Sequence, residues 1–537
     1  MKKRIVSTLL ICAMVIGTFA GCGKNEAKTE TKESTATSES KQESTPAKES
    51  ETVVEEKERE HVELVVYNFT QSAEQPGTEE AMEAVNEYLK EKLNTTLDIH
   101  LYATAATYKE TVPTMLAGGT YMDMVLVGSE GVPFATYAQQ EAFLPLEDYI
   151  DEYLPETKAQ VPESAWDAFS WNGHVYAVPV FKDFASQQDV IANASLVEEL
   201  GLGYPEKYDT YWDIIDWLYE VKAARDAKYP ELKDQPITKW RGYKYVFPAF
   251  YYYDPIVAND DMVVANFPGL AGFEGMGEGE TVFCPYYTPE YRKAVKQMSQ
   301  LVADKVVPYD RSAFDTDSVM SKAGQLIATF SSGYVYYDEN SNKNFKSKLL
   351  RADNAIITTS SLTPGGYAIT NQCENVERAL EVIDLIASDP YLATLWRFGP
   401  EGTNWVDENN DNVVEWGPAN SGDTVAYKQW YGWNFGGLGV TKVQPGQPGN
   451  LGELLKELND SGTVSANIGF AMNQEPVVNE IAACSNVIAE YHSVLMQGQA
   501  TDPDKMVDEF VAKLKASGMD KIVAEAQKQL DEWKKAN

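Results

Sequence analysis

The residues that could carry catalytic or metal chemistry are few and widely spaced in this chain of 537 residues. The four histidines, His61, His100, His174 and His492, form no HExxH motif and no pair at metal-ligand spacing. The chain also has no GxSxG, P-loop or GxGxxG motif. Its 81 acidic residues leave a catalytic carboxylate pair open as an alternative. The easily recognised enzyme chemistries are excluded.

One acidic stretch places side-chain oxygens at alternate positions, at Asp407, Asn409, Asp411 and Glu415. Val413, which has no side-chain oxygen, takes the alternate position between Asp411 and Glu415. This spacing is like that of the first part of a calcium-binding loop. The stretch lacks the glycine of position 6 and the bidentate glutamate of position 12. We therefore predict an acidic turn and no cofactor, and keep Ca²⁺ bound by these four residues as the alternative.

The N-terminus has the layout of an export signal. Basic residues at 2–4 precede an apolar run from Ile5 to Ala20, which is shorter than the ~20 residues of a membrane-spanning helix. The run ends in FAGC, which resembles a bacterial lipobox, although its first position is usually leucine. The cysteine of a lipobox receives a diacylglyceryl group and becomes the mature N-terminus. This resemblance implies a signal peptide at 1–21 and lipidation at Cys22.

The segment that follows is rich in Glu, Lys, Ser and Thr and has almost no large apolar residue. Such a composition cannot bury enough surface to offset the entropy of ordering, so we expect residues 22–60 to be a disordered tether behind the lipidated cysteine. The formal net charge of the whole chain is -36, which argues against nucleic acid and anionic lipid as partners. The rest of the chain is too long for one core and is long enough for two lobes.

Strand and helix patterns alternate along the first part of this body. Glu63 to Phe69 and Met122 to Val127 are β-branched and apolar and predict strands, and residues 78–93 between them have helical spacing. The alternation predicts βαβ units and a parallel sheet. Residues 171–180 predict two short strands, and the C-terminus predicts three helices, over 479–496, 505–517 and 520–534.

Several stretches, taken in order, resemble the extracellular solute-binding proteins of ABC importers. WNGHVYAVPV at 171–180 is similar to a strand pair of that family, and MLAGGTYMDMVLVG at 115–128 is similar to a second segment. The stretch at 281–307 is similar to a third, although Asp304-Lys305 stands where Glu-Gly is usual. RFGPEGTNW and the closing helices resemble the large lipoprotein subfamily of Gram-positive bacteria, which belongs to the carbohydrate-type family 1. These matches span most of the body.

The resemblance implies an α/β fold of the periplasmic-binding-protein type, with parallel-type sheets, flanking helices and a ligand cleft between two lobes. The first lobe would take residues 61–178 plus 351–396, and the second lobe 179–350 plus 397–537. The implied protein is a monomer without enzymatic activity, anchored by lipid at the extracellular face of the membrane. It captures an oligosaccharide and delivers it to an ABC transporter permease. A surface glycoside hydrolase and a binding protein for a peptide or other non-sugar solute are the alternatives.

A sugar-binding cleft would present aromatic planes to the C–H faces of the sugar and hydrogen-bonding groups to its hydroxyls. Three loop aromatics are candidates for the planes, with packed loop residues as the alternative: Tyr334, Trp430 and Trp433. The hydrogen-bonding candidates follow predicted strands, with solvated loop residues as the alternative: Asn68, Phe69, Ser129, Glu130, Lys182 and Asp183.

Overall fold

Two separate hydrophobic cores organise the part of the chain that the structure describes. This computed structural model describes residues 59–70, 75–240, 246–257, 261–309, 328–332, 345–421, 425–429, 434 and 436–536, with the backbone alone at 239–240 and 328–332. Arg59–Asn537 form one compact unit. The predicted signal peptide, Cys22 and nearly all of the predicted tether lie outside the described residues.

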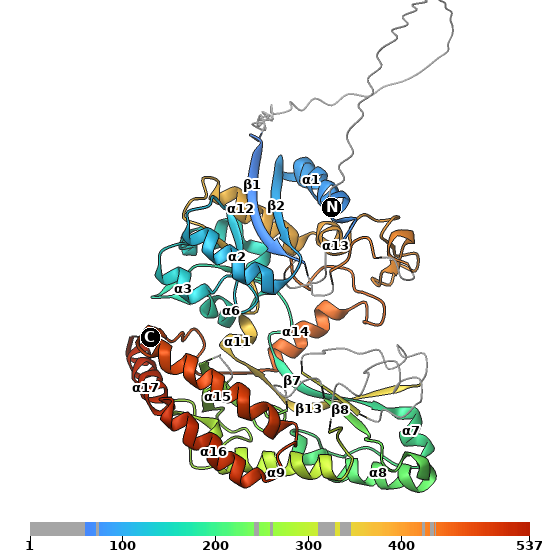
Figure 1. Cartoon of the computed structure of the whole chain (residues 1–537). Coiled ribbons are helices and arrows are strands. Elements are labelled where there is room, and N and C mark those ends of the chain that lie inside the picture. The colour runs from blue at the N-terminus through green and yellow to red at the C-terminus, as the bar shows by residue number, and fades with distance from the viewer. Residues whose placement is uncertain are drawn as a thin grey trace, which may run out of the picture. The chain divides into compact units, whose positions relative to one another are not determined.

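The first core lies around a mixed sheet of five strands (Figure 1). Their order is β2 (Thr95–Tyr102), β1 (Val62–Phe69), β3 (Met124–Val127), β14 (Gly366–Ile369) and β6 (Val178–Pro179). Strand β1 is parallel to β2 and β3, whereas β14 is antiparallel to β3 and β6. The carboxyl ends of β2, β1, β3 and β6 therefore lie at one edge of this sheet. The predicted α/β fold and its parallel strand pairs are confirmed.

The helices of this region present apolar faces to the first core. In α1 (Thr78–Leu93) the buried residues Ala81, Met82, Val85 and Leu89 follow the helical period that the sequence predicts. The other helices around this core are α2 (Ala105–Ala117), α3 (Phe134–Gln139), α4 (Glu147–Tyr153), α5 (Pro155–Gln160), α6 (Glu163–Ala168), α12 (Val376–Ser388) and α13 (Pro390–Phe398). The predicted strand pair at 171–180 forms the hairpin of β4 (Ser170–Trp171) and β5 (His174–Val175), followed by β6.

The second core lies against another mixed sheet of five strands. Their order is β17 (Thr463–Val464), β13 (Ser347–Ile357), β7 (Ser186–Asn193), β12 (Ala328–Ser332) and β8 (Thr238–Trp240). Strand β7 is antiparallel to both neighbours, whereas β12 is parallel to β8 and β13 is parallel to β17. A smaller antiparallel sheet contains β11 (Val282–Phe283), β10 (Val263–Asn266) and β9 (Tyr253–Val257).

Helices α15, α16 and α17 close the chain and pack against one another, and α15 and α16 also pack on α9 (Figure 1). Their bounds are α9 (Pro289–Ala303), α15 (Val478–Met496), α16 (Pro503–Ala516) and α17 (Met519–Ala536), which confirms the three predicted C-terminal helices. Helices α7 (Ala194–Glu199), α8 (Ile215–Lys228), α11 (Thr359–Leu362) and α14 (Leu451–Ser461) and the hairpin of β15 (Trp405–Val406) and β16 (Glu415–Trp416) complete the main elements. At the start of helix α9 the Thr288 hydroxyl accepts a hydrogen bond from the Tyr291 amide, and Pro289 follows this cap residue, as is common at the first position of a helix. Among the described residues, none of the helices combines the length and the apolar character needed to cross a bilayer.

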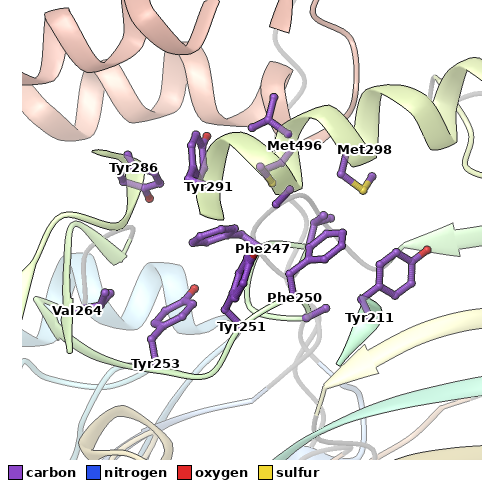
Figure 2. Packing of buried hydrophobic residues seen from close by; sticks show 14 of the residues in the cluster. Tyr211, Phe247, Phe250, Tyr251, Tyr253, Val264, Tyr286, Tyr291, Met298 and Met496 are labelled. Atoms are coloured by element: carbon purple, nitrogen blue, oxygen red, sulfur yellow. The ribbon is translucent and has the colours of Figure 1, made fainter. Parts of the chain in front are cut away.

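Many aromatic side chains pack together within the second core, as Figure 2 shows. Phe247 packs edge to face on Tyr291, with ring centroids 5.1 Å apart, and Phe250 packs edge to face on Tyr211 at 5.0 Å. Aromatic pairs in these geometries add about 0.5–1.5 kcal/mol to what their burial alone contributes. The aromatic cluster around 246–253, which the sequence shows as a run of Tyr and Phe, is therefore the interior of this core.

Within the ranges that the structure describes, the chain passes three times between the two cores, and we call these segments the crossings. The first lies between Ala185 and Val190, the second between Ala352 and Ala355, and the third between Leu458 and Phe470. The predicted lobe boundaries at 178 and 351 fall close to the first two crossings. The prediction gave 397–537 to the second lobe, but five residues of this range pack in the first core: Tyr427, Val443, Leu451, Leu455 and Leu458. Packing thus favours a third crossing after Leu458 over the predicted one at 396.

Candidate ligand-binding site

The first sheet brings three of the predicted residue pairs to one of its edges. Asn68 and Phe69 are the last residues of β1, Ser129 and Glu130 follow β3, and Lys182 and Asp183 follow β6. These three strands run in the same direction, so all six residues lie at the carboxyl edge of the sheet. In α/β sheets this edge is the usual place for a ligand.

Asn68 is fully buried, and its side chain is used inside the protein. Its Nδ2 donates hydrogen bonds to the Tyr367 hydroxyl and to the Asn434 carbonyl oxygen, both at 2.8 Å. Its Oδ1 accepts a hydrogen bond from the Phe69 amide at 2.7 Å, and Phe69 is itself 2% exposed. Burial leaves neither side chain open to a ligand in this structure. Asn68 instead attaches residue 434 to the end of β1.

Amide side chains fix the chain on both sides of residues 430–433. Before this segment, Gln75 exchanges two hydrogen bonds of 3.0 Å with the backbone of Lys428. After it, Asn434 Nδ2 donates to the Phe69 carbonyl oxygen at 2.9 Å. The predicted aromatics Trp430, Trp433 and Tyr334 lie outside the described residues.

The sequence did not indicate three residues whose hydrogen bonds fix the chain at this edge of the sheet: Gln75, Tyr367 and Asn434. The only sequence signal was the position of Asn434 in the same short loop as the two tryptophans. Its contact with Asn68 spans 366 positions of the chain, so no local pattern reveals it.

Ser129 and Glu130 are open to solvent and have fixed backbones. Their amides donate to the carbonyl oxygens of Thr363, at 2.9 Å, and Pro364, at 3.2 Å. Lys109 Nζ donates to the Ser129 carbonyl oxygen at 2.9 Å and lies 3.7 Å from the Glu130 carboxylate. The preceding Gly128 has a φ of 122°, and a Cβ there would lie 2.5 Å from the Thr363 oxygen, so this turn requires glycine. The turn presents a hydroxyl, a carboxylate and an ammonium group at the sheet edge.

Lys182 and Asp183 form an ion pair where the chain enters the first crossing. Lys182 Nζ lies 3.0 Å from Asp183 Oδ1, and the two side chains are 12% and 21% exposed. Asn459 on α14 holds their backbone, since its Nδ2 donates to the Lys182 carbonyl oxygen and its Oδ1 accepts from the Phe184 and Ala185 amides. The charged groups remain partly accessible while the backbone beneath them is fixed.

The oxygens of the acidic stretch after β15 bind donors of the protein itself. Asp407 Oδ2 lies 2.7 Å from Lys442 Nζ, and Asp407 Oδ1 accepts a hydrogen bond from the Asp411 amide at 3.2 Å. Asn409 Nδ2 donates to Glu415 Oε1 at 2.7 Å. Burial opposes ionisation of Asp407, but the Lys442 ammonium lowers the pKa of its carboxyl below the ordinary value. Across the described ranges, no group of three or more His, Cys, Asp or Glu residues is arranged to hold a metal ion.

Comparisons with known proteins identify the class to which this architecture corresponds. The chain is 24% identical, over 466 residues, to the carbohydrate ABC transporter substrate-binding protein of Streptococcus pneumoniae serotype 4 (strain ATCC BAA-334 / TIGR4), with 85% of this chain and 88% of the relative covered. Residues 466–535 match a family described as a domain of unknown function (DUF3502).

Solved structures show the same fold. The N-glycan transport solute binding protein NgtS from Streptococcus pneumoniae has a TM-score of 0.71 at 22% identity, with 88% of this chain and 99% of that chain covered. The substrate-binding protein FusA of S. pneumoniae, in complex with kestose, has a TM-score of 0.54 at 16% identity, with 88% of this chain and all of that chain covered.

The predicted resemblance to the solute-binding proteins of ABC importers is confirmed. The chain has the two-lobed α/β fold of these proteins. Each of the relatives above is named as a binding protein and not as an enzyme.

Proposed function

We propose that this protein captures an oligosaccharide outside the cell and delivers it to the permease of an ABC transporter. The observation that carries the proposal is the similarity to a named carbohydrate ABC transporter substrate-binding protein over 88% of that protein's length. NgtS, which shares the fold, has been solved in complex with Man1GlcNAc and with Man5GlcNAc. The proposed ligand is therefore an oligosaccharide.

The chemistry of the sheet edge supports this class of ligand. Sugar hydroxyls both donate and accept hydrogen bonds, and charged partners bind them more strongly than neutral ones. The turn of Ser129 and Glu130 with Lys109, and the ion pair of Lys182 and Asp183, offer donors and acceptors that are partly accessible. We propose that these residues contact the ligand. Asn68 and Asn434 would not contact it, and would instead hold in place the segment of chain that contains Trp430 and Trp433.

A thermal-shift screen tests the ligand class. The folded chain is heated with Man5GlcNAc, with fructo-oligosaccharides and, as a second class, with a mixture of short peptides. A ligand at 100 times its dissociation constant adds about 2.7 kcal/mol to the free energy of unfolding, so a true ligand raises the midpoint clearly. Stabilisation by peptides with no response to any sugar would replace the carbohydrate assignment.

The enzyme alternative is tested with the same sugars. The protein is incubated with each stabilising oligosaccharide, and the mixture is analysed by mass spectrometry for shorter products. We expect the oligosaccharide to remain intact. Shorter products that disappear when a carboxylate such as Glu130 is replaced by Gln would establish a glycoside hydrolase.

We further propose that Cys22 carries the lipid that holds the protein as a monomer at the extracellular face of the membrane. The support is the lipobox-like FAGC and the apolar run before it. Wild type is expected in the membrane fraction and Cys22→Ser in the soluble fraction, with Cys373→Ser as the matched control. A Cys22→Ser protein that stays fully membrane-bound contradicts the anchor.

A further inference from the structure

The second sheet carries a charged pair on the face that is turned away from the second core. Val190 and Ala192 of β7 are fully buried in that core. Successive side chains of a strand point to opposite faces of its sheet, so Asp189 lies on the other face. Arg351 of β13 is the register partner of Asp189, and its Nε lies 3.6 Å from Asp189 Oδ1. The side chain of Asp189 is 2% exposed and that of Arg351 is 27% exposed, so the cation is the accessible half of this pair.

This pair lies close to the candidate site of the first core. Strand β7 begins at Ser186, directly after Ala185, which packs in the first core. Asp189 is therefore four residues from that core, a span of at most about 14 Å for an extended chain. The ion pair of Lys182 and Asp183 lies just before the same short segment. Figure 1 shows the second sheet with helices α8 and α9 on one side and helix α14, which packs in the first core, on the other, so the pair is on the side of the first core.

Three cations of this region are each held beside a carboxylate, and we call these three the compensated pairs. With the distance between the nitrogen and the oxygen, they are Lys109–Glu130 at 3.7 Å, Lys182–Asp183 at 3.0 Å and Arg351–Asp189 at 3.6 Å. The side chains of the three cations are 42%, 12% and 27% exposed, in the same order. With both groups ionised, each pair has a formal net charge of zero. The compensated pairs therefore offer charged hydrogen-bonding groups without adding net positive charge to the site.

A compensated pair suits a sugar hydroxyl better than a sugar carboxylate. A hydroxyl both accepts and donates hydrogen bonds, so two neighbouring hydroxyls can satisfy the cation and the carboxylate of one pair. The ionised carboxylate of a uronic or sialic acid only accepts, and at the cation it would lie near the carboxylate that the protein already holds there. The repulsion between these two like charges cancels much of the attraction of the cation. The formal net charge of -36 opposes the approach of an anion as well.

We infer that this protein selects neutral oligosaccharides over acidic ones, and that Glu130, Asp183 and Asp189 are the carboxylates that set this specificity. Glu130 and Asp183 contact the ligand in this scheme, since both are partly accessible. Asp189 is almost fully buried, so it is a positioning residue that acts through the Arg351 guanidinium. The inference rests on the proposed function, and it names the class of oligosaccharide that the same site takes.

Titration calorimetry on the full chain with Cys22→Ser tests the inference. The neutral probes are Man5GlcNAc, fructo-oligosaccharides and xylo-oligosaccharides, and the acidic probes are oligogalacturonides and sialyllactose. Each neutral sugar that binds is also tested after its primary hydroxyl groups have been oxidised to carboxylates, which gives a matched acidic form. The titrations are made at pH 8, where the Asp189 carboxyl is ionised, because burial raises its pKa to about 7. We expect the neutral form to bind at least about tenfold more tightly than its oxidised form.

Three variants then remove one carboxylate each and keep the size of its side chain: Glu130→Gln, Asp183→Asn and Asp189→Asn. Each leaves its cation uncompensated, so we expect the ratio of the association constants, oxidised form over neutral form, to rise by about tenfold. High salt should reduce this rise most for Glu130→Gln, since its ion pair is the most exposed of the three. Glu490→Gln is the matched control, because it removes the carboxylate of an exposed ion pair between α15 and α16, and it should leave the ratio unchanged.

The outcomes are distinct. Acidic sugars that bind wild type as tightly as neutral ones overturn the inference and leave the proposed function intact. A rise of the same size in Glu490→Gln would mean that overall charge sets the preference, and not the compensated pairs. If Asp189→Asn weakens both forms equally, Asp189 is structural only, and its positioning role is overturned.

Two further results complete the test. If Asp189→Asn does not fold, Glu130→Gln combined with Asp183→Asn tests the same specificity at the first core, and an unchanged ratio there overturns the inference. A protein that binds peptides and none of the sugars overturns the proposed function, and the inference with it, a result that no change in the ratio can imitate.

Discussion

The two cores fix their chain connections with different chemistry. At the site edge of the first core the fixing groups are neutral amides, namely Asn68, Gln75, Asn434 and Asn459. In the second core the fixing groups are carboxylates, among them Asp209 and Asp254. Amides do not titrate, whereas the buried carboxylate of Asp254 does, so the difference predicts that pH acts on these connections of the second core and not on the amide-held edge of the first core.

Two carboxylates of the second core have strongly raised pKa values. Burial raises the pKa of Asp254 to about 6, against the opposing hydrogen bonds from Ser465 and Asn467. Burial also raises the pKa of Asp189 to about 7, against the opposing charge of Arg351, whose Nε lies 3.6 Å away. A carboxyl with a raised pKa favours the folded state most when it is protonated. Its contribution to stability is therefore complete below about pH 4 and is lost as the pH rises through 6 to 7.

The largest expected effect comes from the aromatic packing of the second core. Phe250→Ala removes a fully buried ring that packs on Tyr211 and on Trp212, and we expect a loss of about 4 kcal/mol in the free energy of unfolding. Leu126→Ala is the matched change in the first core and should cost about 3 kcal/mol. Urea unfolding monitored by fluorescence measures both. A loss below about 1 kcal/mol for Phe250→Ala would contradict the packing described for this core.

The next largest effect tests directly whether the carboxylates of the second core titrate while the amides of the first core do not. Asp254→Asn keeps the size and the acceptor oxygen but removes the titration, so it should stabilise the protein above pH 7 by up to about 3 kcal/mol. Below pH 4 the two proteins should be equally stable. Unfolding midpoints measured from pH 4 to 8 give the difference between wild type and variant at each pH. A difference that does not grow with pH would show that Asp254 does not titrate in this range.

The amide counterpart should show a smaller effect that does not change with pH. Asn68→Ala leaves the Asn434 carbonyl with fewer donors and the Phe69 amide without its side-chain acceptor, so we expect a loss of about 2 kcal/mol. The same series of midpoints from pH 4 to 8 measures it. If this loss varied with pH as strongly as the gain in stability from Asp254→Asn, the contrast between the two cores would fail.

The smallest effect provides the baseline for the others. Lys456 and Asp460 form an ion pair one helical turn apart on α14, with side chains that are 61% and 64% exposed. Solvent screens such pairs, and we expect Lys456→Ala to change the free energy of unfolding by less than about 0.5 kcal/mol. Urea unfolding at low and high salt measures this change. A loss above about 1 kcal/mol would mean that this exposed ion pair contributes more to stability than solvent screening allows.

The sequence predicts the elements of the first core well because their patterns are local. Strand β1 follows from its β-branched run, and α1 follows from the spacing of Ala81, Val85 and Leu89. Strand β7 was not predicted, although it is the middle strand of the second sheet. Its first residues, SQQD, are polar, and Asp189 is buried beside Arg351 in the neighbouring strand. A strand that begins with polar residues and buries an acidic side chain lacks the apolar alternation on which such a prediction depends.

The sequence predicts which residues of the candidate site follow the strands. It does not predict what each of these residues does there. Ser129, Glu130, Lys182 and Asp183 lie at the predicted edge because the direction of parallel strands places them there. The burial of Asn68 depends on Tyr367 and Asn434, which are remote in sequence. The third crossing was misplaced for the same reason, since Tyr427 returns to the first core only through tertiary contacts.

The way in which the folded part begins determines how it resists a force that pulls on its N-terminal end. The Arg59 guanidinium makes two hydrogen bonds with the Glu381 carboxylate on α12, at 2.9 and 2.6 Å, and β1 follows three residues later. Every residue of β1 from Val62 to Phe69 is paired with β2 in parallel register. A pulling force on Arg59 along the strand must therefore shear the whole ladder at once, because it cannot peel the bonds apart one by one. If the protein is held to a surface by its N-terminus, a pulling force reaches the folded part at a strand that is loaded in shear.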